Sequence, residues 1–316
     1  MSTRVAVPDA PPALGPWSRL RRLPLWAVVV IAGLTWWLVG FLPWIVASAF
    51  DGSPLVGAEA DAFPAVPLIA GQLGALVTGA FTGGLVAGGV GLVAPPGDRR
   101  LVALATFGGM ATVSAIAVVQ AGRVIGGAGG FQGDHRVVLG VGAIAGLATA
   151  AGWALGSCWI FGRPGLGVGL GALSGVVPFW LGTLAVTVIN AVSPTGTMTS
   201  LRGINWAAAI VLALALVVVG VRPLSRLAWW PVVLLVAWFV GPALTAAGYI
   251  EVYLRSGAGL PDTLPEALAA TWQVFGHALL PGNRDLLPWG VAVVVAAGVA
   301  VVLARRSVRP IEAPTD

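Results

Sequence analysis

Long apolar segments, separated by short polar connections, make up most of this chain. A helix that crosses a lipid bilayer needs about 20 consecutive, mostly apolar residues. We predict such spans at Leu25–Val46, Pro67–Val93, Leu101–Val119, Val137–Phe161, Leu166–Val188, Trp206–Val221, Leu227–Gly248 and Trp289–Ala304. The pattern therefore predicts an all-α fold, a polytopic transmembrane helix bundle of about eight spans.

The connections between these spans leave no room for a soluble domain. The longest runs from about Arg255 to Pro288, whereas a folded domain needs about 50 residues or more. We expect a cytoplasmic N-terminal tail over residues 1–24, one membrane-embedded domain over 25–304 and a cytoplasmic C-terminal tail over 305–316. The first apolar run exceeds the roughly 7–15 residues of a signal-peptide core, so we interpret it as a retained span.

Composition supports the membrane assignment and narrows the choice of partners. Only 9% of the residues are charged, and the mean hydropathy is +0.93. The sequence pI is near 10.9, but the basic residues lie at span ends and form no solvated basic patch, so we expect no nucleic-acid partner. All 17 basic side chains are arginine, a bias typical of GC-rich bacteria. We expect the protein in a bacterial plasma (inner) membrane.

The positions of the arginines predict the orientation of the bundle. Positive charges collect in cytoplasmic connections. With the N-terminus inside, only five of the 17 arginines fall on the outer side. These are Arg123, Arg136, Arg202, Arg255 and Arg284. An even number of spans then returns the C-terminus to the cytoplasm, so we predict that both termini are cytoplasmic.

Glycines recur at helical spacing in the second, fourth and fifth predicted spans. Residues four apart share a helix face, and glycine there lets another backbone approach closely. The candidate helix-packing residues are Gly79, Gly83, Gly84, Gly88, Gly142, Gly146, Gly152, Gly156, Gly167, Gly171 and Gly175. They predict that these three spans form the centre of the bundle. The pattern fits close packing, and it equally fits a conduit between moving helices.

Uncharged polar residues inside or beside the spans are candidates for lining a cavity. They are Gln72, Gln120, Thr183, Thr187 and Asn190. Threonine hydroxyls often bond back to their own helix, whereas a buried primary amide needs a partner. Interhelical hydrogen bonding and solute binding therefore both remain open for this set.

The outer segment before the last span predicts an amphipathic helix over about residues 263–280. Thr263, Pro265 and Glu266 form a helix-start pattern. Apolar residues then recur at steps of three and four, at Leu264, Leu268, Trp272, Phe275 and Leu279, with His277 on the other side. We expect this extracytoplasmic helix in the membrane interface or across the mouth of the bundle.

Three residues near this side complete the candidate set. Glu251 follows the seventh span, where it either pairs with Arg255 in the interface or faces an outer vestibule. Trp272 and His277 are the corresponding vestibule or lid candidates on the amphipathic helix.

Catalytic and cofactor-binding patterns are absent from the sequence. No ionisable residue lies near a predicted midplane, where such groups usually mark function. The two histidines, His135 and His277, lie in outer connections, and Cys158 is the only cysteine. We expect no metal, no cofactor and no enzymatic activity. An enzyme hidden in the outer region would need Glu251, His277, Arg284 and Asp285 to converge.

Two functional interpretations remain. The first is a non-catalytic subunit or scaffold of a bacterial cell-envelope complex, which works in the lipid bilayer with another membrane or envelope protein. The alternative is a permease or flippase-like transporter of a small or lipidic solute, which would require a polar cavity lined by Gln72, Gln120 or Asn190. The sequence determines neither the solute nor the oligomeric state.

Overall fold

The computed structural model describes residues 23–51, 63–94, 97–127, 135–192, 202–254 and 264–306. Within these ranges the regular elements are all helical. The α-helices are α1 (Leu25–Gly40), α2 (Leu42–Asp51), α3 (Leu73–Gly89), α4 (Arg99–Gly127), α5 (His135–Ser157), α6 (Arg163–Val192), α7 (Arg202–Val219), α8 (Trp229–Tyr249), α9 (Leu264–Leu279) and α10 (Leu286–Arg306). The prediction of an all-α fold is confirmed for the described residues.

Six of these helices are long and apolar enough to cross a membrane, namely α3, α4, α5, α6, α8 and α10, some with short 3₁₀ extensions. The pair α1 and α2 passes the same test together but is bent by 56°, which brings the number of spans up to seven. Helix α7 is apolar but shorter. The fold is that of a multi-pass membrane protein.

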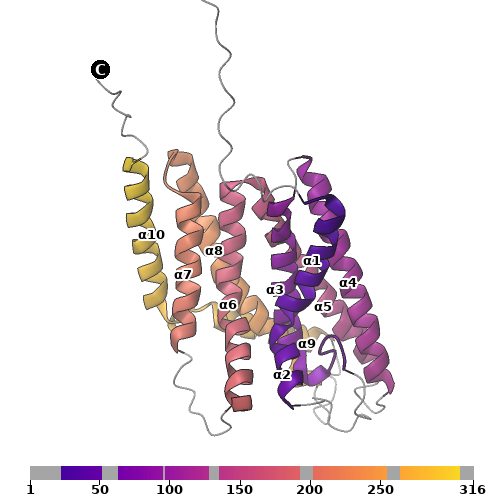
Figure 1. The fold of residues 1–316 in the computed structure, drawn as a ribbon. Coiled ribbons are helices and arrows are strands. Elements are labelled where there is room, and N and C mark those ends of the chain that lie inside the picture. Colours follow the sequence, from indigo (N-terminus) through magenta and orange to yellow (C-terminus); the bar gives the residue numbers. More distant parts are fainter. Residues whose placement is uncertain are drawn as a thin grey trace, which may run out of the picture.

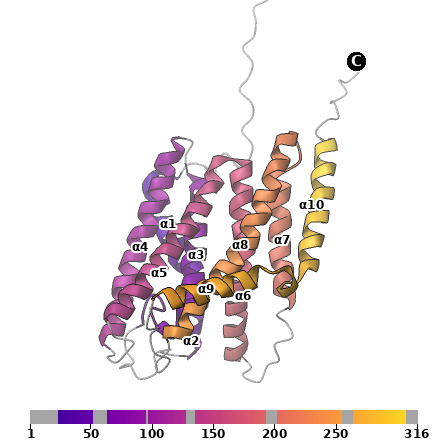
Figure 2. The ribbon, with the colours of Figure 1, turned by 180° about the vertical axis from the view of Figure 1, so that it is seen from behind.

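The long helices run side by side, and α9 lies across them (Figures 1 and 2). Helix α3 contacts α1, α5, α6 and α8, and 78% of its apolar span is buried inside the protein. The corresponding value is 28% for α5 and 22% for α6. Of the three glycine-rich spans that we expected at the centre, only α3 is therefore enclosed by other helices.

The first two predicted spans differ from the sequence prediction, the first by a break inside it and the second by a later start. The segment Leu25–Val46 is not one straight helix, because it breaks between Gly40 and Leu42. The second span does not begin at Pro67; its α-helix starts at Leu73, after a short 3₁₀ turn at Ala70–Gln72. Apolar composition alone does not distinguish a buried helix from buried non-helical chain.

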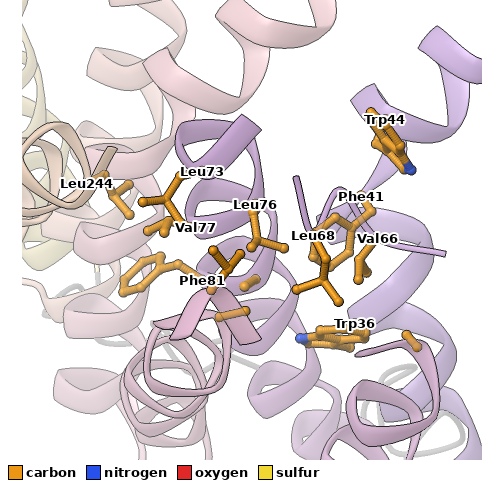
Figure 3. Close-up of a cluster of buried hydrophobic side chains, with 14 of the residues drawn as sticks. Trp36, Phe41, Trp44, Val66, Leu68, Leu73, Leu76, Val77, Phe81 and Leu244 are labelled. Atoms are coloured by element: carbon orange, nitrogen blue, oxygen red, sulfur yellow. The ribbon is translucent and has the colours of Figure 1, made fainter. Parts of the chain in front are cut away.

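Non-helical chain before α3 enters the main hydrophobic core. Val66 and Leu68 are almost fully buried, in a cluster with Trp36 and Phe41. Figure 3 shows these side chains together, with Leu73, Leu76 and Phe81 of α3 nearby. Backbone without helical hydrogen bonds is tolerated at membrane depth only where the protein supplies partners.

Side chains from α1, α2 and α4 supply these partners. The Trp37 and Trp44 indoles donate to the carbonyl oxygens of Ala65 and Pro64, at 2.8 and 3.0 Å. The amide of Gln120 donates to the carbonyl of Phe63 at 2.8 Å and accepts the N–H of Ala65 at 2.7 Å. Gln120 therefore holds the chain before α3 in place, and it lines no cavity with Gln72.

The glycine face of α5 meets the glycine face of α3 at backbone distance. A Cβ atom added at Gly84 would lie 2.2 Å from the carbonyl oxygen of Thr149. One added at Gly152 or Gly156 would lie 2.1 or 1.9 Å from the carbonyl oxygens of Phe81 and Leu85. The absence of side chains at these positions is therefore what allows the two helices to approach.

The other candidate packing glycines divide into two groups. An added Cβ would come within 3.0 Å of neighbouring atoms at Gly79, Gly83, Gly88, Gly167, Gly171 and Gly175. At Gly142 the nearest atom is 3.3 Å away, on the side chain of Val118, and at Gly146 no atom lies within 4 Å. Gly146 therefore makes no close helix contact, although it shares the spacing of the others.

Helix α9 packs on α8 with only part of the predicted apolar stripe. Ala267 is buried, and Phe275 stacks on Phe239 of α8 with ring centroids 6.2 Å apart. Leu268 and Trp272 are 57% and 71% exposed. Of the predicted apolar stripe, Phe275 therefore faces α8, whereas Leu268 and Trp272 are exposed.

Two alanine substitutions in α5 test the close approach of α3 and α5. Gly152→Ala places a methyl group against the backbone of Phe81, so we expect the free energy of unfolding to fall by about 1–3 kcal/mol. Gly146→Ala is the matched control on the same helix, with an expected change within about 0.5 kcal/mol. Chemical unfolding of the detergent-solubilised protein, followed by far-UV circular dichroism, measures both. Equal effects of the two substitutions would contradict this packing.

Candidate functional site

Two prolines lie inside membrane helices of the described chain, and a third follows the bend between α1 and α2. Pro43 lies in the first turn of α2, Pro178 inside α6 and Pro242 inside α8. Proline has no N–H, so it cannot bond the carbonyl four residues earlier. The carbonyl oxygens without this helical partner are those of Val39, Ser174 and Trp238.

A tryptophan on α6 supplies the missing donor at the first break. The indole Nε1 of Trp180 donates to the carbonyl oxygens of Val39 and Gly40, at 3.0 and 3.2 Å. One shared N–H thus serves the end of α1, where Pro43 prevents the usual bond. The contact fastens α6 to the bend between α1 and α2.

The first cavity lies beside this bend and has a volume of about 200 Å³. Its lining combines aromatic rings with hydroxyl and amide groups from α1, α2, the start of α3, and α6. The lining residues are Gly40, Phe41, Pro43, Trp44, Ala47, Gln72, Ala75, Thr78, Gly79, Trp180, Thr183 and Thr187. We call this space cavity one. Its composition suits an uncharged polar group held among aromatic rings.

The second cavity lies between α6, α7, α8 and the turn that joins α9 to α10, with a volume of about 430 Å³. Both remaining interrupting prolines line it. The lining residues are Ser174, Gly175, Pro178, Phe179, Asn205, Ala208, Ala237, Gly241, Pro242, Thr245, Ala278, Asn283, Arg284, Asp285 and Trp289. We call this space cavity two. Unlike cavity one, its lining contains charged groups, the guanidinium of Arg284 and the carboxylate of Asp285.

Arg284 supplies the missing donor at the break in α8. Its Nη2 donates to the carbonyl oxygen of Trp238 at 2.8 Å, the position left open by Pro242. Its Nε donates to the carbonyl oxygen of Ala278 at 3.1 Å, and the guanidinium lies 4.1 Å from the ring centroid of Trp238. Burial lowers the pKa of Arg284 from its ordinary value, but a guanidinium stays protonated at neutral pH.

The structure brings together part of the predicted cavity-lining set. Gln72, Thr183 and Thr187 all line cavity one. The Thr183 hydroxyl also donates to the carbonyl oxygen of Phe179 at 2.9 Å, along its own helix. Gln120 instead binds the backbone before α3, and Asn190 is exposed near the end of α6 and lines neither cavity.

The vestibule candidates do not converge on one site. A Glu251 carboxylate oxygen accepts the N–H of Gly74 at 3.3 Å, at the amino end of α3, where a negative charge is favourable. Trp272 is exposed on α9, and the backbone carbonyl of His277 accepts the side-chain amide of Asn283 at 2.8 Å. Arg255 lies outside the described residues. Glu251 and His277 are also absent from the lining of cavity two, which holds Arg284 and Asp285.

Sequence reasoning missed the residues that define the two cavities. Trp180 was not among the predicted site residues, and Arg284 was considered for orientation and as one of the four outer residues of a hidden enzyme. The available signal was the proline within each apolar run, since each implies a carbonyl that needs a donor from elsewhere. Among the described residues no three His, Cys, Asp or Glu side chains gather in a way that could hold a metal ion.

Comparison of the chain with protein-family models, with curated proteins and with solved structures gives no match. The functional argument therefore depends on the geometry of the two cavities.

A double-mutant cycle tests the link between Pro43 and Trp180. Trp180→Phe leaves the carbonyl oxygens of Val39 and Gly40 without their donor, so we expect a loss of about 1–3 kcal/mol in unfolding free energy. Pro43→Ala restores a backbone N–H that can bond Val39, so Trp180→Phe should cost about 1 kcal/mol less in that background. Denaturant unfolding followed by far-UV circular dichroism gives the four free energies. Strictly additive effects would show that Trp180 does not compensate for the proline.

Proposed function

We propose that the protein crosses the bacterial plasma membrane eight times, with α1 and α2 together forming one bent span and α7 a short one. The cluster of Val28, Ala94 and Val102 places the start of α1 at the end of the bundle where α3 gives way to α4. Helix α10 ends at this same end (Figure 1). Arg99, Arg100, Arg163, Arg222, Arg226 and Arg305 lie in the connections or helix ends there. The positive-inside tendency supports a cytoplasmic location for this end and for both termini.

We further propose that the protein is a permease or flippase-like transporter of a lipidic, amphipathic solute. The observation that carries this proposal is the position of α6 between the two cavities. Trp180, Thr183 and Thr187 of α6 line cavity one, and Ser174 and Pro178 line cavity two. One helix, interrupted by its own proline, therefore forms a wall of both.

Many membrane transporters form the substrate site with discontinuous helices; α6 and α8 remain helical, but each has a proline beside the cavity. A proline break removes a backbone hydrogen bond and makes a helix easier to bend at that point. In α6 and α8 the breaks at Pro178 and Pro242 lie beside the same space. Bending at these two positions would change the width of cavity two without unfolding either helix.

Both cavities lie toward the outer end in the proposed orientation. On the cytoplasmic side of cavity two, the helices are joined by a tightly packed apolar cluster. Val168 of α6, Leu216 and Val219 of α7 and Val233 of α8 belong to it, and all but Val168 are fully buried. The described conformation supports an outward-facing state, in which a solute reaches the cavities from the outer leaflet and this cluster closes the route inward.

A non-catalytic subunit or scaffold is the second candidate function. The exposed Leu268 and Trp272 of α9 favour it, because these apolar side chains stay uncovered while Phe275 of the same helix packs on α8. Another membrane or envelope protein could bind there. We place this function second because it gives no role to the two cavities.

A lipid-movement experiment tests the transporter proposal. The purified protein is reconstituted into vesicles that contain a fluorescent acyl-labelled phosphatidylglycerol, and dithionite bleaches the label from outside. We expect wild-type protein to expose inner-leaflet lipid that stays protected in protein-free vesicles. Thr187→Trp fills cavity one and should lower the rate toward that of protein-free vesicles.

The matched control is Thr112→Trp, which changes an exposed position on α4 that lines neither cavity. This variant should move lipid at the wild-type rate. Wild-type vesicles that behave like protein-free vesicles, over a series of lipid head groups, would contradict the transporter proposal and leave the subunit or scaffold function.

A further inference from the structure

The donors of Arg284 are only partly used inside the protein. A guanidinium carries five N–H donors. Among the described residues, its acceptors are the carbonyl oxygens of Ala278 and Trp238. These two bonds and the stacking over the Trp238 ring fix the position of the group at the wall of cavity two. The remaining N–H groups are available to a ligand in the cavity.

The charge of Arg284 is not balanced by a close carboxylate in the described part of the chain. The nearest acidic neighbour in sequence, Asp285, uses one carboxylate oxygen to accept the N–H of Leu287 at 3.2 Å. This bond places the carboxylate at the amino end of α10, where the helix dipole favours it. Cavity two therefore has a fixed cation and a carboxylate that is engaged by the backbone.

Arg284 lies directly before an apolar helix that is long enough to cross a membrane. The apolar span of α10 begins at Leu286, two residues after the arginine. Leu280 before the turn and Leu286 and Leu287 after it are 51%, 47% and 66% exposed, as side chains that face lipid would be. Figure 2 shows the turn between α9 and α10 at the level where α7 and α10 begin. The cation thus directly precedes a candidate membrane span, with exposed leucines before and after it along the chain.

We propose that cavity two binds the phosphate of a membrane lipid head group through Arg284, while the acyl chains remain outside among the exposed leucines. A guanidinium pairs with phosphate through two parallel N–H···O bonds, which is the geometry that a partly used arginine can still offer. This assignment names the class of solute for the proposed transport function. It rests on that function for the claim that the bound lipid is the transported solute.

The binding experiment compares two lipids that differ only in the phosphate. Native mass spectrometry of the full chain in detergent is run with dioleoyl phosphatidic acid and with dioleoylglycerol. We expect wild-type protein to retain phosphatidic acid and not dioleoylglycerol. Arg284→Gln should weaken the binding of phosphatidic acid about tenfold or more, the usual size of a charged hydrogen bond.

Two further variants guard against a trivial loss of fold. Arg284→Gln frees the Trp238 carbonyl, so Ala208→Leu serves as a second variant that narrows cavity two and leaves both arginine hydrogen bonds in place. It should also weaken binding. Arg123→Gln removes an exposed arginine near the end of α4, at the same end of the bundle, and should bind like the wild type.

Each outcome has a defined consequence. Equal retention of phosphatidic acid by wild type, Arg284→Gln and Ala208→Leu would overturn the site. Displacement of the lipid by millimolar inorganic phosphate would support phosphate recognition and overturn the membrane lipid as its source. Retention that depends on Arg284 without lipid movement in vesicles would support the site and contradict transport. Lipid movement that is unchanged in Arg284→Gln would support transport and contradict the site.

Discussion

The structure depends on one constraint, which is that backbone polar groups away from water must find partners inside the protein. A continuous helix satisfies this constraint by itself, but this chain departs from continuous helix at several places. At the bend between α1 and α2 the partner is Trp180, at the proline of α8 it is Arg284, and before α3 it is Gln120. Each donor comes from an element far away in sequence, so each break also joins distant parts of the fold. Among the buried side chains of the described residues, the indole N–H of Trp159 has no hydrogen-bond partner.

This constraint also accounts for the location of the cavities. Each cavity lies beside a proline, where a side chain from another element reaches across to the freed carbonyl. Trp180 does this beside cavity one, and Arg284 does it beside cavity two. Elsewhere in the bundle, the glycine faces of α3 and α5 pack with backbone contact, and the space of about 400 Å³ beside them and α8 is lined by apolar side chains. Close packing and polar hollows therefore occupy separate parts of the same bundle.

Hydropathy predicted the membrane helices because the length and composition of a span are local properties. It did not predict the break at Pro43 or the non-helical chain around Val66, because buried chain of either conformation is equally apolar. Glycine spacing identified the contact face of α5 at Gly152 and Gly156 but also included Gly146, since spacing shows which residues share a face and not what that face meets. In the same way the sequence identified Gln72, Thr183 and Thr187 because they are polar residues within or beside apolar runs. Trp180 was missed because its hydrogen bond depends on a single N–H of a mainly apolar ring.

The two cavities differ in charge for a physical reason. Cavity one reaches Thr78 and Gly79 in the buried interior of α3, where an unpaired cation would carry a large desolvation cost. Its polar groups are accordingly uncharged, and the single N–H of Trp180 is already shared between two carbonyls. Cavity two lies at the start of the α10 span, where the end of the apolar layer reduces that cost and an arginine with donors to spare can be held. An amphipathic solute that passed along α6 would therefore meet its charged contact at the membrane edge and only uncharged polar contacts deeper in the bundle.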